Sequence, residues 1–93
     1  MSDIDCNFRV EGRVQGVGFR MWTRDQARGL GLRGWVRNRD DGSVEVHVSG
    51  APEAVETLRE SLRTGPPAAH VRELSEGDGA TALPESGFQI RRS

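Results

Sequence analysis

A glycine-rich stretch, Gly12 to Arg20, most constrains how this chain can fold. It holds three glycines within seven residues, and it lies between an alternating strand pattern upstream and a helix-like segment downstream. Glycine adopts positive φ without steric cost and leaves backbone N–H groups uncovered. When such a turn leads straight into a helix, its amide donors gather at the positive end of the helix dipole. The stretch therefore predicts a turn that can bind an anion.

Arg20 falls in the first turn of the helix that this pattern predicts. A cation is unfavourable there by about 0.3–1 kcal/mol, because the N-terminal end of a helix is already positive. A phosphate-like anion between the loop amides and the guanidinium would remove this conflict. Taken alone, Arg20 would more often be a surface ion-pair partner, and that alternative stays open.

Composition narrows the function classes. The 93 residues predict one domain, residues 1–93, and 13 basic residues nearly cancel 14 acidic ones. This balance argues against a nucleic-acid or membrane partner held by bulk charge. The one cysteine, Cys6, allows no internal disulfide, and the acidic N-terminus has no apolar run. We expect a cytoplasmic monomer with no nucleic-acid or membrane partner.

The order of periodic segments predicts the fold class. Apolar residues alternate with polar ones in three strand-like segments, and two further segments have helical character. The order is β-α-β-β-α-β with a short extra strand, which predicts an α+β sandwich of one mainly antiparallel sheet with two helices on one face. The expected strands are 4–10, 32–38, 43–49, 70–74 and one beginning at 88; the expected helices are 19–30 and one beginning at Pro52 and stopping at Gly65; 75–87 is expected as a loop.

Other residue types with possible chemistry have simpler interpretations. His47 and His70 have no Cys or carboxylate at metal-ligand spacing, so no metal site is predicted. His47 lies on the polar phase of its strand and is expected at the solvated surface. Cys6 shares the inward phase and is expected as a small buried hydrophobe. Trp22 and Trp35 are expected to pack in the core, with base stacking on single-stranded nucleic acid as the alternative.

Two phosphate-binding motifs can be set aside. A Walker-type loop would need a Lys followed by Ser or Thr after its last glycine, and the chain has neither there. Residues 29–34 match the dinucleotide-binding glycine pattern literally, but they follow a helix and lead into a strand, the reverse of what that motif requires. Gly29 and Gly31 are expected to end the first helix.

Asn38 is the second candidate for the anion site. On its own it would be a turn residue, since Asn tolerates turn conformations and can bond its own backbone. In a split βαβ arrangement, however, the turn after the first strand and the end of the second strand can share one edge of the sheet. A carboxamide there could hold a water, because its oxygen accepts and its NH₂ donates hydrogen bonds.

Two long motifs carry a resemblance to a known family. They run from Gly12 to Arg20 (Gly-Arg-Val-Gln-Gly-Val-Gly-Phe-Arg) and from Gly34 to Gly50, the second containing Gly34-Trp35-Val36-Arg37-Asn38 and Gly42-Ser43-Val44. They resemble the two signatures of the acylphosphatases. The segments 30–32 and 65–68 and the Phe-x-Ile-Arg ending at 88–91 are also similar, so the resemblance covers essentially the whole chain.

The resemblance implies a ferredoxin-like fold and hydrolysis of the carboxyl-phosphate bond of acyl phosphates, without metal or cofactor. It also implies site residues. Arg20 would bind the phosphoryl oxygens, and Asn38 would orient the attacking water. The backbone amides of the loop would form the phosphate cradle: Gln15, Gly16, Val17, Gly18 and Phe19.

Two alternatives remain. The same domain resembles the N-terminal part of the hydrogenase-maturation carbamoyltransferases, so the chain could be an accessory module; the chain's length and the absence of Cys clusters lead us to expect an independent protein. A ferredoxin-like nucleic-acid-binding domain is the third hypothesis, and it predicts salt-dependent oligonucleotide binding.

Overall fold

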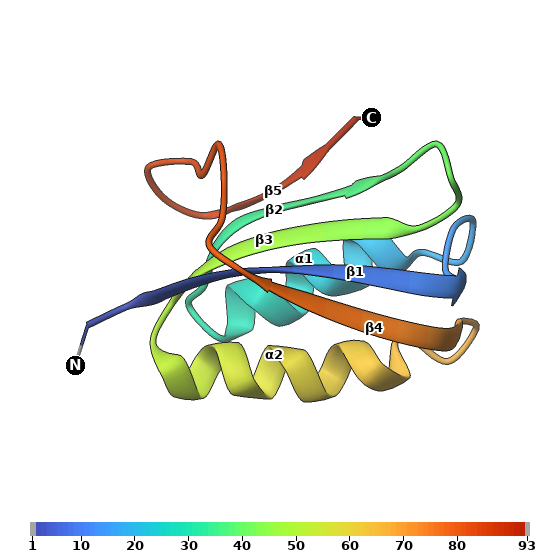
Figure 1. The fold of residues 1–93 in the computed structure, drawn as a ribbon, viewed down its shortest axis with the longest axis horizontal. Coiled ribbons are helices and arrows are strands. Elements are labelled where there is room, and N and C mark those ends of the chain that lie inside the picture. The colour runs from blue at the N-terminus through green and yellow to red at the C-terminus, as the bar shows by residue number, and fades with distance from the viewer. Residues whose placement is uncertain (1, 93) are drawn as a thin grey trace.

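The computed structural model describes residues 2–92 and contains one five-stranded sheet with two helices against one face (Figure 1). The predicted α+β order is confirmed. Neither helix within these residues is long and apolar enough to cross a membrane. The elements are β1 (Ile4–Arg13), α1 (Phe19–Gly29), β2 (Arg33–Asn38), β3 (Val44–Gly50), α2 (Pro52–Thr64), β4 (His70–Asp78) and β5 (Phe88–Arg91).

The strand order is β4-β1-β3-β2-β5, and every neighbouring pair is antiparallel except β2 and β5. Because β1 and β2 both run antiparallel to the central strand β3, they run parallel to each other. Their carboxyl ends therefore meet at one edge of the sheet, as Figure 1 shows for the turn after β1 and the hairpin after β2. The sequence predicted this shared edge.

The core lies between the sheet and the two helices. In β1 the inward residues Cys6, Phe8 and Val10 alternate with more exposed neighbours. Each fully buried large apolar side chain contributes about 1.5–3 kcal/mol relative to an exposed one, so this layer holds the sheet and helices together. The helices bury one face each, and the buried residues on these faces are Phe19, Thr23 and Ala27 in α1 and Val55, Leu58 and Leu62 in α2.

Both helices begin and end near the predicted residues. Pro52 occupies the first turn of α2, where its missing N–H costs nothing, and Gly65 follows the last residue. Gly31, with φ of 70°, turns the chain after α1. Trp22 is half-buried against the core and meets Phe19 edge to face, with ring centroids 5.4 Å apart. The prediction that Trp22 packs in the core is therefore broadly right.

The expected loop at 75–87 is partly wrong, because β4 continues to Asp78. The extra residues pair with β1, for example Phe8 with Glu76. β4 is an outermost strand of the sheet, and this part of it is largely exposed, so its polar sequence resembles that of a loop. Arg59 of α2 fixes it through two hydrogen bonds to the Glu76 carboxylate, at 2.7 and 2.8 Å. A contact so distant in sequence leaves no local signal.

The expectation of a solvated His47 is wrong. Its side chain is buried, with 6% of the residue exposed, although it lies on the helix-free face of the sheet. Residues 79–87 cover it: the Thr81 N–H donates to His47 Nδ1 at 3.0 Å, and Trp35 Nε1 donates to the Thr81 carbonyl oxygen at 2.8 Å. The Trp35 and His47 rings stack with centroids 4.3 Å apart. Trp35 is thus buried, but on this face and not in the core beneath the helices.

Cys6 is a small buried hydrophobe, as predicted. Its burial, together with nearby carboxylates such as Glu76, raises the pKa of the thiol to about 11. The thiolate is the reactive form of cysteine, so this side chain is chemically inert at neutral pH.

Gly12 offers a test of the backbone geometry that leads into the turn. Its φ is 129°, and the pairing of β1 with β4 shifts register between Glu11 and Gly12. A Cβ there would overlap the His70 carbonyl oxygen. We expect Gly12→Ala to lower the free energy of unfolding by about 2–3 kcal/mol, as measured by urea titration. Gly29→Ala is the control, since a Cβ there meets nothing within 4 Å; equal effects of the two variants would contradict the prediction.

Candidate active site

A cavity of about 200 Å³ opens at the edge where β1 and β2 end. It brings together residues that are far apart in sequence, from the turn before α1, from α1 itself and from β2 and β5. Among the predicted site residues, Gln15 and Val17 are not in its wall. The lining residues are Val14, Gly16, Gly18, Phe19, Arg20, Met21, Asn38 and Ile90.

The turn before α1 exposes backbone donors. Gly16 and Gly18 have φ of 74° and 75°, which residues with a Cβ rarely adopt. Gly18 is the N-cap and provides no side-chain cap, and α1 has no acidic residue in its first turn. The first backbone hydrogen bond at this end is from Trp22 N–H to Gly18 O, at 3.0 Å. Within residues 2–92, the amides of 15–19 are thus left without a backbone acceptor, as an anion site requires.

Arg20 is half-buried in the cavity wall. Within the described part of the chain, its guanidinium makes no ion pair and no hydrogen bond. The alternative of an ordinary surface ion pair therefore has no support. A planar guanidinium can donate two parallel hydrogen bonds to a phosphoryl group. The positive charge of Arg20 and the loop amides would act on the same anion.

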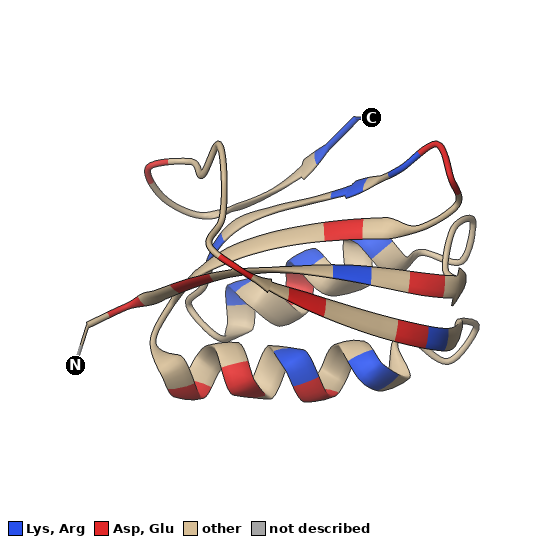
Figure 2. Cartoon of the chain, viewed as in Figure 1, with Lys and Arg blue, Asp and Glu red and all other residues tan. Residues whose placement is uncertain are grey.

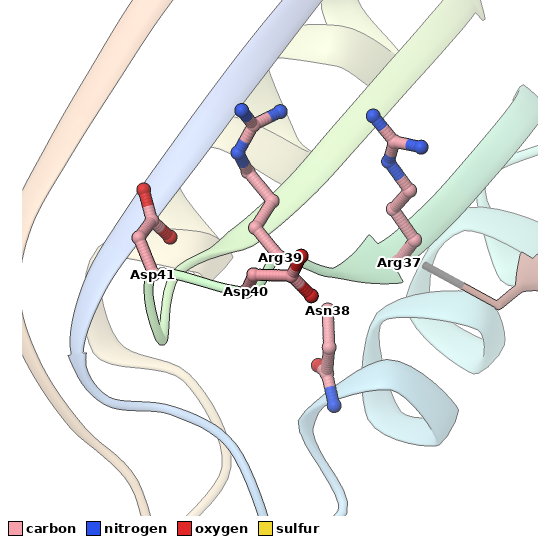
Figure 3. A pocket seen from close by; sticks show the side chains of 5 residues that line it. All are labelled: Arg37, Asn38, Arg39, Asp40 and Asp41. Carbon is pink, nitrogen blue, oxygen red and sulfur yellow. The ribbon is translucent and has the colours of Figure 1, made fainter.

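Asn38 is the last residue of β2 and pairs with Val44, so it lies in the strand and the turn begins after it. Figure 3 shows its side chain extending away from those of Arg37 and Arg39, toward the turn before α1. Its Oδ1 atom is buried and accepts no hydrogen bond from residues 2–92. A buried acceptor without a partner is costly, by about 1–3 kcal/mol, unless a ligand or water satisfies it.

The side chain of Gln15 has a role that the sequence did not indicate. Its Nε2 atom donates to the carbonyl oxygens of Arg39 and Ser43, at 2.8 and 2.9 Å. These two bonds join the turn before α1 to the hairpin that follows Asn38. They hold the backbone donors of the turn and the carboxamide of Asn38 in a fixed relation.

Glu45 supports Asn38 from the other face of the sheet. Its carboxylate accepts hydrogen bonds from Arg37 Nε at 2.8 Å, Arg39 Nη1 at 2.9 Å and His47 Nε2 at 2.8 Å. Both chain neighbours of Asn38 are therefore fixed by one group. Burial alone would raise the pKa of Glu45, but the hydrogen bonds from His47, Arg37 and Arg39 outweigh it and lower the pKa to about 2. In sequence, Glu45 resembled any solvated strand residue.

A second hollow of about 290 Å³ lies beside the hairpin and is lined by residues 37–41 (Figure 3). Its two arginines face Glu45, and its acidic residues include Asp41, which pairs with Arg9 at 2.8 Å. Basic and acidic residues both occur in this region (Figure 2). The hollow lacks the unpaired cation and the free amides of the first cavity, so the first cavity is the stronger candidate.

Within residues 2–92, no three His, Cys, Asp or Glu side chains are grouped closely enough to hold a metal ion. The donors that converge on the first cavity are backbone amides, a guanidinium and a carboxamide. Such groups bind and stabilise anionic oxygens.

Comparisons of sequence and of structure find similar known proteins. The profile of the Acylphosphatase family matches residues 6–90. An acylphosphatase from Rhizobium etli is 59% identical over 73 residues, covering 76% of this chain and 78% of its own. The structure of an acylphosphatase from Coxiella burnetii superposes with a TM-score of 0.89 at 34% identity, covering 97% of this chain and 94% of its own. HypF from T. kodakarensis is also similar, with a TM-score of 0.83 at 29% identity, but the match covers 98% of this chain and 12% of HypF.

The Glu45 cluster predicts how stability depends on pH. The pKa of Glu45 is about 2 in the folded protein, below the usual 4.5. The ionised carboxylate therefore stabilises the fold fully above pH 4.5, and this stabilisation is lost as the pH falls toward 2. At pH 7, we expect the free energy of unfolding of wild type to exceed that of Glu45→Gln by roughly 3 kcal/mol. This difference should shrink in urea titrations at pH 4 and pH 3. Glu60→Gln is the control, because Glu60 is exposed and lies 3.6 Å from Arg63; a pH-independent gap for Glu45→Gln would contradict the assignment.

Proposed function

The chain belongs to the acylphosphatase family of enzymes, and from this premise we propose how it hydrolyses an acyl phosphate. One observation carries the proposal. Arg20, which has no partner within residues 2–92, lines the same small cavity as the glycine turn and the Asn38 side chain. This combination can bind a phosphoryl group on one side and a water on the other.

The phosphoryl group binds in the turn before α1. The backbone amides of Gln15, Gly16, Val17, Gly18 and Phe19 form the cradle, and Arg20 donates to the phosphoryl oxygens. Gln15 and Val17 are not among the residues that line the cavity, so the role proposed for them rests only on their backbone N–H groups, which have no backbone acceptor within residues 2–92. These donors are held in place before the substrate arrives, and they stabilise the charge that spreads over the oxygens in the transition state.

Asn38 orients the attacking water. Its Oδ1 accepts a hydrogen bond from the water, and its buried position without another partner supports this role. The rigid support of Glu45 and Gln15 on either side of Asn38 keeps the water on the line of attack. Fixed positioning of this kind supplies a large part of the rate in phosphoryl transfer.

In the reaction, the water oxygen forms a bond to phosphorus, and the bond between phosphorus and the acyl oxygen breaks. The carboxylate leaves with the electron pair of that bond. One proton of the water passes to a phosphoryl oxygen, since none of the cavity-lining residues within 2–92 has a carboxylate or an imidazole to accept it. The products are a carboxylate and inorganic phosphate, and a carboxylate is a good leaving group that needs no general acid.

The size of the cavity fits a small substrate. Its volume of about 200 Å³ is below the roughly 300–1,000 Å³ that is usual for sites of drug-sized ligands. Basic and acidic residues are interspersed along the elements in Figure 2, and the 13 basic residues nearly cancel the 14 acidic ones. We propose a cytoplasmic monomer that acts on a small acyl phosphate without a nucleic-acid partner.

Replacement of Asn38 tests the water-orienting role. We expect Asn38→Ala to lower kcat on benzoyl phosphate by about 10²–10³, because the water loses its fixed acceptor. KM and the urea midpoint should change little, since Asn38 does not hold the phosphate. Near wild-type turnover by a folded Asn38→Ala protein would refute the role.

Replacement of Arg20 tests phosphate binding. Arg20→Gln should raise KM and lower kcat together, with kcat/KM reduced by at least about 10². It should also weaken competitive inhibition by inorganic phosphate. Arg24→Gln is the matched control, because Arg24 lies one turn further along α1 and pairs with Asp25. Equal losses for the two variants would indicate a general charge effect and not a binding residue.

The metal-free character is tested by steady-state hydrolysis of benzoyl phosphate with EDTA present, with p-nitrophenyl phosphate assayed in parallel. We expect turnover of the acyl phosphate alone and no effect of EDTA. Loss of activity in EDTA that returns with a divalent metal would contradict the mechanism.

A further inference from the structure

Two side chains in the cavity wall have no role in the mechanism above. Arg20, Asn38 and the glycine turn account for the polar part of the wall, and Val14 and Phe19 are almost fully buried and support it from beneath. The remaining lining residues are Met21 and Ile90. Both are apolar, and both retain exposed surface.

Met21 is unusually exposed for an apolar residue of this chain. It is 57% exposed, and within residues 2–92 the only other large apolar residue that is classed as exposed is Ile4, at 39%. The buried face of α1 consists of Phe19, Thr23 and Ala27, so Met21 lies outside it. The fold therefore does not require an apolar residue at position 21.

Ile90 approaches the cavity from a different element. It lies in β5 and pairs with Val36 of β2, two residues before Asn38. It is half-buried against the core, with part of its side chain in the cavity wall. An isolated apolar residue on a surface is unremarkable, but here two apolar side chains border a phosphate-sized cavity.

We propose that Met21 and Ile90 form an acyl shelf that binds the carbon part of the substrate, and that the enzyme prefers acyl phosphates with apolar acyl groups. This inference rests on the proposed function, because it assumes that the phosphoryl group occupies the cradle beside Arg20. The leaving oxygen points away from the attacking water, so the acyl group extends out of the cradle, toward the part of the wall that the polar groups do not occupy.

The shelf explains a broad preference and not a single substrate. Met21 is unbranched and flexible, so it can adapt to acyl groups of different shape. An acetyl group is too short to bury much of either side chain. A benzoyl or branched-chain acyl group would cover both, and the gain grows with the apolar area that is removed from water.

The test compares benzoyl phosphate with acetyl phosphate in wild type and Met21→Gln. Gln matches Met in length and in helix propensity, so α1 should be unaffected. We expect KM for benzoyl phosphate to rise about 3- to 10-fold with kcat unchanged, because the lost contact is the same in the ground and transition states. Acetyl phosphate kinetics should change by less than about twofold.

Two further variants serve as controls. Met21→Leu should keep the benzoyl preference, because the side chain remains apolar. Ile4→Gln removes the other exposed apolar side chain, at the far end of β1 from the turn, and should change neither substrate. Equal losses on both substrates in Met21→Gln, or no change on either, would overturn the shelf.

A binding measurement separates the shelf from the proposed reaction. Phenacylphosphonate and acetonylphosphonate keep the carbonyl and the phosphoryl group but cannot be hydrolysed. We expect wild type to bind phenacylphosphonate more tightly by calorimetry, and Met21→Gln to reduce the ratio of the two Kd values about 3- to 10-fold. An unchanged ratio overturns the shelf even if turnover is normal. A changed ratio in a protein without turnover supports the shelf and refutes the proposed reaction.

Discussion

The central position of β3 is the constraint on which the rest of the structure depends. Its antiparallel pairing with both β1 and β2 forces these two strands to run in the same direction without touching each other. The glycine turn and Asn38 are separated by 20 residues or more, and only this arrangement brings them to one edge of the sheet. Gln15 then fixes the distance between them with two hydrogen bonds across the gap. Strand order thus determines where the cavity lies, and side chains such as Gln15 then fix its geometry.

The second constraint is electrostatic and lies on the opposite face of the sheet. Glu45 accepts hydrogen bonds from both neighbours of Asn38 and from His47, which the loop 79–87 covers. The strand that carries the carboxamide is therefore held from the opposite face by a partly buried ionic cluster. A single carboxylate that is 18% exposed gives this edge of the sheet a rigidity that a hairpin tip would otherwise lack.

The sequence predicted the features that depend on local pattern. Alternation in Phe8 and Val10 indicated an inward strand face, and Pro52 and Gly65 marked the ends of α2. The split βαβ order also allowed the turn before α1 and the end of β2 to share one edge of the sheet, and Arg20 and Asn38 line one cavity there. The misses share one cause. The burial of His47 and Trp35 and the pairing of the end of β4 depend on segments at least 34 residues away in sequence. The residues next to them in sequence therefore carry no signal for these contacts.

The parallel pairing of β5 with β2 has a consequence for how the protein is made. Ile90 reaches the cavity from the last strand, while the turn before α1 lies near the start of the chain. The cavity wall is therefore incomplete until residues about 70 positions apart have both left the ribosome. Contacts of such long sequence separation form late and slowly in folding. The turn before α1 and Arg20 are therefore synthesised well before Ile90, so the polar part of the cavity wall is present in a growing chain before its apolar part is complete.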